Sequence, residues 1–251
     1  GNNAMGFYLD GTTNFTGAGN VNVNGQNVIL FNILSNGVFT NNFNITSSAG
    51  SSYTLSAVKD GTFYYNGTIN LSGNGSVVNG NNSAVLIDTA SQINSADSGT
   101  MGISLDGQYT GAVPSGFTSG VEGENRGTIS LTGNNSAGLY GANGVRFLNN
   151  GSITTGNDSI GIRTSGAGSL IVNNGTIQTG SGSQGMYGEE SSLLENNGNI
   201  LSSGAKTTGI YGESTGAMTI SNTGTINLLG DDSIGIYAKG TGAKTITNIG
   251  T

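Results

Sequence analysis

The residues that could carry acid–base or nucleophilic chemistry are few in this sequence, and they are scattered. The chain has 251 residues, with 14 Asp and Glu, no His and no Cys. Without His or Cys, neither a Ser–His nor a Cys–His arrangement for nucleophilic catalysis can form. The acids stand mostly in turn-like stretches, and the adjacent pairs Asp231-Asp232 and Glu189-Glu190 are typical of solvated turns. The sequence therefore predicts a non-enzymatic protein with no catalytic residues, no metal ligands and no cofactor.

Charge and glycine patterns argue against several kinds of binding. Lys and Arg number only 7, the net charge is −7 and no basic stripe occurs, so no nucleic-acid partner is expected. The 46 glycines form neither the G-x-x-x-x-G-K-[ST] phosphate loop nor the calcium-binding G-G-x-G-x-D repeat. No apolar run approaches the roughly 18 residues of a membrane span, so this segment is not expected to insert into a membrane.

Two phrases repeat along the second half of the chain and define its organisation. The second phrase follows each copy of the first and reads GNNSAGLY, GNDSIGIR, GSGSQGMY, GAKTTGIY or GDDSIGIY. Self-similarity at such a fixed period indicates a solenoid. Both ends of the chain fall inside a repeat, which predicts a segment of a longer solenoid. The first phrase, N-x-G-x-I, recurs at steps of 24, 24, 23, 26 and 26 residues on Gly127, Gly151, Gly175, Gly198, Gly224 and Gly250.

The spacing of apolar residues identifies the kind of solenoid. Ile226-Asn227-Leu228 and Ile234-Gly235-Ile236 alternate with period two, which is the pattern of β-strands. Gly, Asn, Asp and Ser separate these runs, as tight turns require. Three short strands and three turns fill about 24 residues, so each repeat is one coil. The sequence predicts one all-β parallel β-helix over residues 1–251, with roughly ten coils that are irregular over 1–122 and regular over 123–251.

Equivalent positions of successive coils must stack, which predicts two internal ladders. The Ile two residues after each glycine forms a core column from Ile129 to Ile226. The Asn two residues before each glycine forms a structural asparagine ladder, in which amides hydrogen-bond to one another and to the turn backbone. The members of this ladder are Asn125, Asn149, Asn173, Asn196, Asn222 and Asn248.

The first half repeats the same phrases less regularly. GTINLSG around Gly67 matches the first phrase, GNNSAVLI from Gly80 is assigned to the second, and SQINSADSGTMGISL matches both in succession. Phenylalanine is concentrated between residues 14 and 65, which predicts coils filled by larger core side chains. These residues are Phe15, Phe31, Phe39, Phe43 and Phe63.

One insertion interrupts the coils. From Ile103 to Asn125 the chain takes 22 residues, where regular repeats take 10 to 12. The extra residues lie within Asp106–Gly120, which contains the only Pro. Insertions in solenoids become loops, often on the binding face. Two interpretations stay open: a tolerated flexible insertion, or a ligand-binding loop whose contacts are Tyr109, Pro114 and Phe117.

A column of aromatic residues is the second candidate binding site. In each second phrase, the residue after the inward-pointing Ile, Leu or Met must point outward. Exposed Tyr side chains suit protein or sugar ligands, but stacked Tyr side chains equally stabilise neighbouring strands. The column contains Tyr8, Tyr140, Tyr187, Tyr211 and Tyr237, with Arg163 in place of one Tyr.

The alternation N-x-G-x-I…G-x-[DN]-[ST]-x-G-[IL]-Y resembles the passenger repeats of bacterial type V autotransporter adhesins, most closely those of the large fusobacterial outer-membrane adhesins. The resemblance covers the second half closely and the first half loosely. It implies a right-handed parallel β-helix, secreted across the outer membrane and held on the bacterial cell surface by a C-terminal β-barrel outside this segment. It also implies attachment to a host cell-surface receptor or glycan, or to partner bacteria. No binding motif of the family maps onto named positions here.

Two other functions remain open. The segment could be a structural stalk that projects a distal tip, or a β-helix polysaccharide-degrading enzyme, which would need converging carboxylates that the sequence does not display. The open sheet edges of a cut solenoid also predict end-to-end self-association.

Overall fold

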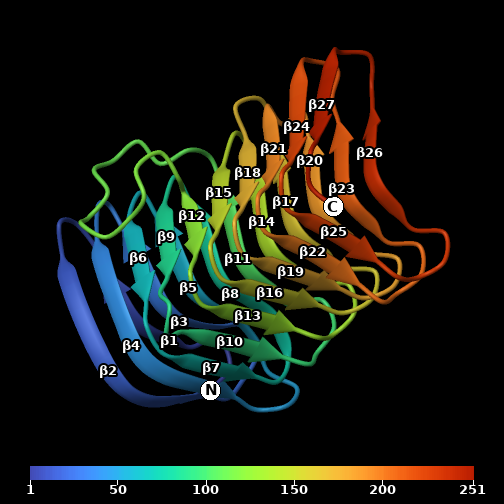
Figure 1. Cartoon of the computed structure of the whole chain (residues 1–251). Helices are drawn as coiled ribbons and strands as arrows, with labels where there is room; N and C mark the ends of the chain where they lie inside the picture. The colour runs from blue at the N-terminus through green and yellow to red at the C-terminus, as the bar shows by residue number, and fades with distance from the viewer.

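The structure, a computed structural model, describes residues 1–251 and consists of strands and turns without any helix. Its strands stack in parallel, coil upon coil, from the N-terminal to the C-terminal end of an elongated solenoid (Figure 1). No part of the chain forms a helix that is long and apolar enough to cross a membrane. The predicted parallel β-helix of about ten coils is confirmed.

The first face of the solenoid is a ten-stranded parallel sheet with one strand from each coil. It contains the GIY-type strands of the second phrase. Its strands, in spatial order, are β1 (Met5–Leu9), β3 (Val28–Leu34), β5 (Ser52–Lys59), β8 (Asn74–Asn81), β11 (Met101–Asp106), β14 (Ala137–Ala142), β17 (Ile160–Ser165), β20 (Gln184–Glu189), β23 (Thr208–Glu213) and β26 (Ile234–Lys239).

The second and third faces follow in each coil, separated by the corner that contains the N-x-G phrase. The second face comprises β6 (Thr62–Tyr65), β9 (Ala84–Ile87), β12 (Gly123–Asn125), β15 (Arg146–Asn149), β18 (Leu170–Asn173), β21 (Leu193–Asn196), β24 (Met218–Asn222) and β27 (Lys244–Asn248). The third face comprises β7 (Thr68–Leu71), β10 (Gln92–Ser95), β13 (Thr128–Leu131), β16 (Ser152–Thr155), β19 (Thr176–Thr179), β22 (Asn199–Ser202) and β25 (Thr225–Leu228).

The first two coils differ from the rest because one long strand covers both the second and the third face. These strands are β2 (Asn14–Val23) and β4 (Val38–Ser47), each of 10 residues. β4 pairs with β6 through its first half and with β7 through Ile45 and Thr46. Three short strands per coil therefore describe the solenoid only from the third coil onward.

One repeat assignment was wrong. GNNSAVLI was aligned with the GIY-type strands, but Ala84–Ile87 forms β9 on the second face, where it pairs with β6 and β12. The GIY-type strand of that coil is β8, whose Val78 aligns with Ile103 of β11. SVVNGN lacks the G-[IL]-Y ending, and the apolar run AVLI resembled that ending more closely.

The core is a continuous column of stacked apolar side chains. Ile129, Ile153, Ile177 and Ile200 are fully buried one above another, and Ile226 is half-buried in the last complete column position. This column continues through Ile93, Ile69 and Ile45 of the earlier coils. In the first coils, aromatic rings fill the core position under the second face instead, with Phe39 and Phe63 stacked at 5.5 Å between ring centroids. Full burial of such a side chain contributes about 1.5–3 kcal/mol.

Two backbone requirements explain the most regularly recurring residues of the repeat. A Cβ on the anchor glycine of one coil would lie 2.0 Å from the carbonyl oxygen of the preceding anchor glycine, as at Gly175 above Gly151, so only glycine fits. The turn before each GIY-type strand contains at least one residue with positive φ, a conformation that Asn, Asp and Gly adopt most readily. These turn residues include Asn3, Asn135, Asp158, Gly182, Lys206 and Asp232.

Candidate ligand-binding site under the inserted loop

The predicted asparagine column forms a buried ladder. The Nδ2 of each Asn donates to the Oδ1 of the next, at 2.7–2.8 Å, from Asn125 through to Asn248. Each Nδ2 from Asn125 to Asn222 also lies 3.3 Å from the carbonyl oxygen of its own anchor glycine. These side chains are 0–1 % exposed from Asn125 to Asn222, so they hold the corner of each coil and cannot contact a ligand.

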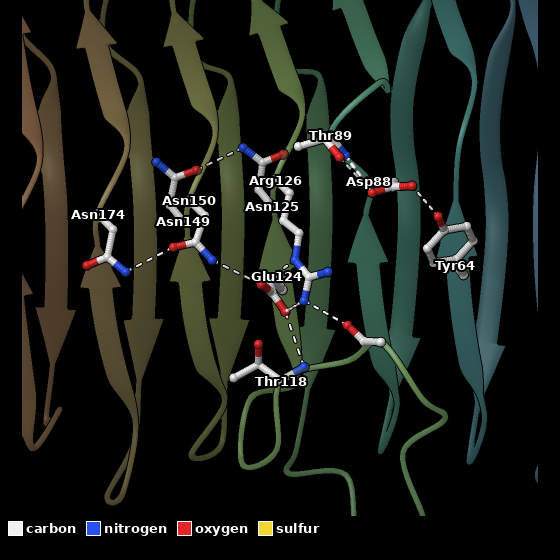
Figure 2. Close-up of polar contacts among 11 residues, drawn as sticks. Tyr64, Asp88, Thr89, Thr118, Glu124, Asn125, Arg126, Asn149, Asn150 and Asn174 are labelled. Atoms are coloured by element: carbon white, nitrogen blue, oxygen red, sulfur yellow. Dashed lines mark hydrogen bonds and ion pairs between the residues drawn. The ribbon is translucent and has the colours of Figure 1, made fainter.

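A second, outer ladder runs beside the first and was not predicted. Asn174 donates to Asn150, Asn197 donates to Asn174, and Thr223 donates to Asn197. These residues stand directly after the buried Asn in each N-N-G or N-T-G phrase, so the doubled Asn was the signal for it. At its N-terminal end, Asn150 Nδ2 donates to Glu124 Oε1 at 3.0 Å, which connects the ladder to the site described below (Figure 2).

The inserted segment between β11 and β12 is a loop that crosses the outer surface of the second face (Figure 1). Hydrogen bonds fasten it near both ends. Gln108 Nε2 donates to the carbonyl of Gly144 at 2.9 Å, and the N–H of Thr118 donates to Glu124 Oε2 at 3.3 Å. Arg126 Nη2 donates to the carbonyl of Gly116 at 2.7 Å. The loop is therefore hydrogen-bonded to the solenoid near both ends, which a flexible insertion would not require.

Two ion pairs lie beneath and beside this loop. Glu122 and Glu124 point to the outer side of the second face, yet their side chains are only 1 % and 3 % exposed. Arg126 Nε and Nη2 donate to the two carboxylate oxygens of Glu124 at 2.6 and 2.9 Å. Arg146 forms the equivalent pair with Glu122, with Nη2 to Oε1 at 2.5 Å. Such two-point pairing fixes each guanidinium in one orientation.

Sequence reasoning missed these charged residues. The run V-E-G-E-N-R alternates, so Glu122, Glu124 and Arg126 fall on the same side of the chain. That alternation was a usable signal, because three charged residues at consecutive outward positions occur nowhere else in the repeats.

A hollow of about 330 Å³ lies between the loop and the second face. Leu86 points outward from β9 but is fully buried. Of the 10 residues that line the hollow, 4 are hydrophobic, and Tyr64, Asp88 and Arg126 contribute polar groups. Its lining residues are Val38, Thr40, Tyr64, Leu86, Asp88, Pro114, Ser115, Gly116, Phe117 and Arg126.

The polar side of this hollow is fixed in charge near neutral pH. Tyr64 donates its hydroxyl to Asp88 Oδ2 (Figure 2). That bond, together with donation from Thr89, holds the pKa of Asp88 below its usual value. Burial, followed by the bond to Asp88, raises the pKa of Tyr64 to about 12. Burial would raise the pKa of Glu124, but hydrogen bonds from Arg126 and Thr118 outweigh it and lower that pKa. Asp88 and Glu124 are therefore ionised and Tyr64 is protonated.

The three predicted loop contacts divide between two places. Pro114 and Phe117 line the hollow and are half-buried. Tyr109 does not line it and is also half-buried, and burial followed by the negative charge of Asp60 raises its pKa. Arg126 keeps one nitrogen, Nη1, without a hydrogen-bond partner in the protein. The hollow can therefore offer a ligand one cationic donor, one carboxylate and apolar side chains.

The Tyr column is contiguous only in the second half of the first face. Tyr140, Arg163, Tyr187, Tyr211 and Tyr237 occupy one register column. Tyr8 belongs to the same column, but Asn32, Ala57, Asn79 and Ser104 separate it from Tyr140.

The faces of these rings are used within the column. The Arg163 guanidinium lies 4.9 and 5.2 Å from the ring centroids of Tyr140 and Tyr187, and its Nη2 lies 2.5 Å from Glu189. Tyr211 stacks on Tyr237 at 5.3 Å. These contacts favour a role of the column in strand pairing over that of a stacking platform.

No group of three or more Asp, Glu, His or Cys residues is arranged to hold a metal ion. No protein-family model, no curated protein and no solved structure matches this chain.

Proposed function

We propose that this chain is a non-enzymatic segment of a cell-surface adhesin, which attaches to a protein or glycan ligand through the hollow under the inserted loop. The observation that carries the proposal is the fastened loop: the one large departure from the repeat is held in place by a buried carboxylate, Glu124, and its arginine. A preformed hollow binds with less ordering cost than a mobile loop. The bacterial cell surface as location rests on the resemblance of the repeats alone.

The ionisation states of the hollow support a binding role over a catalytic one. A general acid or base works best when its pKa lies near the working pH. Asp88 is shifted away from that range, and the pKa of Tyr64 is raised to about 12. A polysaccharide-degrading enzyme would need a pair of carboxyl groups, one of which has a raised pKa and serves as the general acid. The pKa of Asp88 is lowered instead.

A structural stalk remains the second candidate. The coils from β14 onward repeat the same three strands, and their corner amides bond to one another in two ladders. Such a segment serves as a stiff spacer without binding anything itself.

The test is binding of the fluorescently labelled chain to epithelial cells and to partner bacteria, with two matched variants. Thr40→Trp fills the hollow from β4, and Asn32→Trp adds the same side chain to the first face of the same coil. We expect Thr40→Trp to weaken specific binding at least about tenfold and Asn32→Trp to leave it unchanged. Equal binding by both variants contradicts the assignment of the site. Absence of binding by the folded chain favours the stalk.

A further inference from the structure

The third face of the solenoid carries no charged side chain. Its seven strands, β7, β10, β13, β16, β19, β22 and β25, lie side by side along one long face (Figure 1). The chain has 7 basic and 14 acidic residues, and all 21 of them lie on the other two faces or in turns. A solvated protein surface ordinarily mixes charges of both signs, so a charge-free face of this length stands apart from the rest of this acidic protein.

Two columns of outward side chains cover this face, and almost all are hydroxyls or amides. None of them is buried. One column contains Thr68, Gln92, Thr128, Ser152, Thr176, Asn199 and Thr225, and the other contains Asn70, Asn94, Ser130, Thr154, Gln178, Leu201 and Asn227.

The polar groups of this face are mostly free to bind something else. Asn94 Nδ2 donates to Asn70 Oδ1 at 2.9 Å, but the side chains of Gln92, Ser130 and Gln178 make no hydrogen bond within the protein. In the outer corner ladder, by contrast, each amide bonds to the next. Amides and hydroxyls both donate and accept, so this face can pair with a ligand that does the same.

A groove runs along one edge of these columns, parallel to the solenoid axis. It measures about 440 Å³ and spans four coils, from Thr46 on β4 to Ser130 on β13. A separate hollow of about 220 Å³ lies farther along the same face, beside Gln178, Leu201 and Asn227. None of the residues that line this groove is charged. The Oδ2 of Asp97, the residue after the lining residue Ala96, accepts a hydrogen bond from the N–H of Gly73 at 2.6 Å.

We propose that the charge-free third face and its groove bind an uncharged, extended polysaccharide that lies along the solenoid axis. Hydroxyl-rich polymers both donate and accept hydrogen bonds, as this face does. Successive coils repeat at about 4.8 Å, close to the length of one sugar unit, so equivalent side chains can contact successive sugars. Binding here leaves no buried charge unpaired, which would otherwise be costly. This site is independent of the hollow under the inserted loop.

The test is retention of the whole chain on immobilised dextran, amylose, galactan and mannan, with carboxymethyl-dextran and dextran sulfate as charged counterparts. We expect retention on at least one neutral polymer and none on the charged ones, which the net charge of −7 repels. Retention should be constant between about 0.05 and about 1 M NaCl, because no ion pair contributes to it. Failure to bind all four neutral polymers, or a steep loss of binding with salt, overturns the proposal.

Matched variants locate the site. Ser130→Asp places a charge in the groove and should weaken retention at least about tenfold, whereas Ser104→Asp, on the first face, should not change it. Circular dichroism establishes that both variants fold. Equal retention by the two also overturns the proposal. Thr40→Trp should leave retention unchanged, so loss of cell binding through the loop hollow and loss of polysaccharide binding here are separate results.

Discussion

Replacement of one residue in the buried asparagine ladder measures how much that ladder stabilises the solenoid. Asn173 donates to Asn196 Oδ1 at 2.7 Å and accepts from Asn149 Nδ2 at 2.7 Å, and it is fully buried. Asn173→Ala removes both bonds, which contribute about 1 kcal/mol each, and leaves the Asn196 oxygen unpaired at a cost of about 1–3 kcal/mol. The expected loss in the free energy of unfolding is therefore about 3–5 kcal/mol.

Two further variants separate hydrogen bonding from volume and from exposure. Asn173→Asp keeps the shape but sets a carboxylate against Asn196 Oδ1 and the carbonyl of Gly175, so it should destabilise at least as much as Ala. Asn150→Ala removes an exposed amide of the outer ladder and should cost less than about 1 kcal/mol.

The assay must detect local as well as global unfolding, because each coil contacts only its neighbours. Equilibrium urea denaturation followed by circular dichroism reports the global change, and native-state hydrogen exchange of the β18 and β21 amides reports local opening. If Asn173→Ala stays within about 1 kcal/mol of the unmodified chain in both measurements, or matches Asn150→Ala, the ladder is not what fixes the corner.

Four other outcomes are expected. Glu124→Gln should release the loop and speed its proteolysis at least about tenfold, whereas Glu189→Gln, whose carboxylate is 42 % exposed, should not; equal cleavage contradicts the anchoring role. Gly175→Ala should prevent correct stacking, since its Cβ would meet a carbonyl oxygen at 2.0 Å, while Gly216→Ala should fold normally; thermal denaturation decides between them. The folded pKa of Glu124 is lowered, so the stability it adds is present above its ordinary value of about 4.3 and is lost as pH falls below it. The pKa of Tyr64 is raised to about 12, so the stability that this residue adds is complete below about pH 10 and is lost as pH rises toward 12. An ultraviolet titration of the unmodified chain, compared with that of Tyr64→Phe, measures this pKa.

Sequence periodicity predicted the fold well because every coil repeats the same steric requirements. Each anchor glycine, buried Asn and core Ile stacks on the equivalent residue of the next coil. The same residue type therefore recurs at the same position of each repeat. The prediction failed at β9 because Ala84–Ile87 is apolar on both faces: its outward Leu86 is buried beside the loop. A strand covered on both sides loses the alternation that identifies its face.

The site was harder to predict than the fold because the loop brings together residues from different coils. Pro114 and Phe117 were identified from the insertion, but Tyr64 and Asp88 join them only through stacking of β6, β9 and β12. The spacing of these residues along the sequence does not predict that contact. The charged residues that fasten the loop leave a signal in the alternating run V-E-G-E-N-R, but the sequence does not show which backbone groups of the loop they bind.

The inserted loop and the charges beneath it depend on each other. A solenoid tolerates an insertion in one coil because the remaining coils keep their own neighbours. The loop, however, covers part of an outer sheet surface, where its backbone needs partners that ordinary coils do not supply. Glu124 accepts from the N–H of Thr118, and Arg126 donates to the carbonyl of Gly116, so this ion pair satisfies both kinds of backbone group at once. Shortening the loop without changing these residues should therefore expose Leu86 and leave the ion pair without its backbone partners. A shortened loop combined with Leu86→Thr should be more stable than the shortened loop alone, and equal stability of the two in urea would show that the loop does not account for the burial of Leu86.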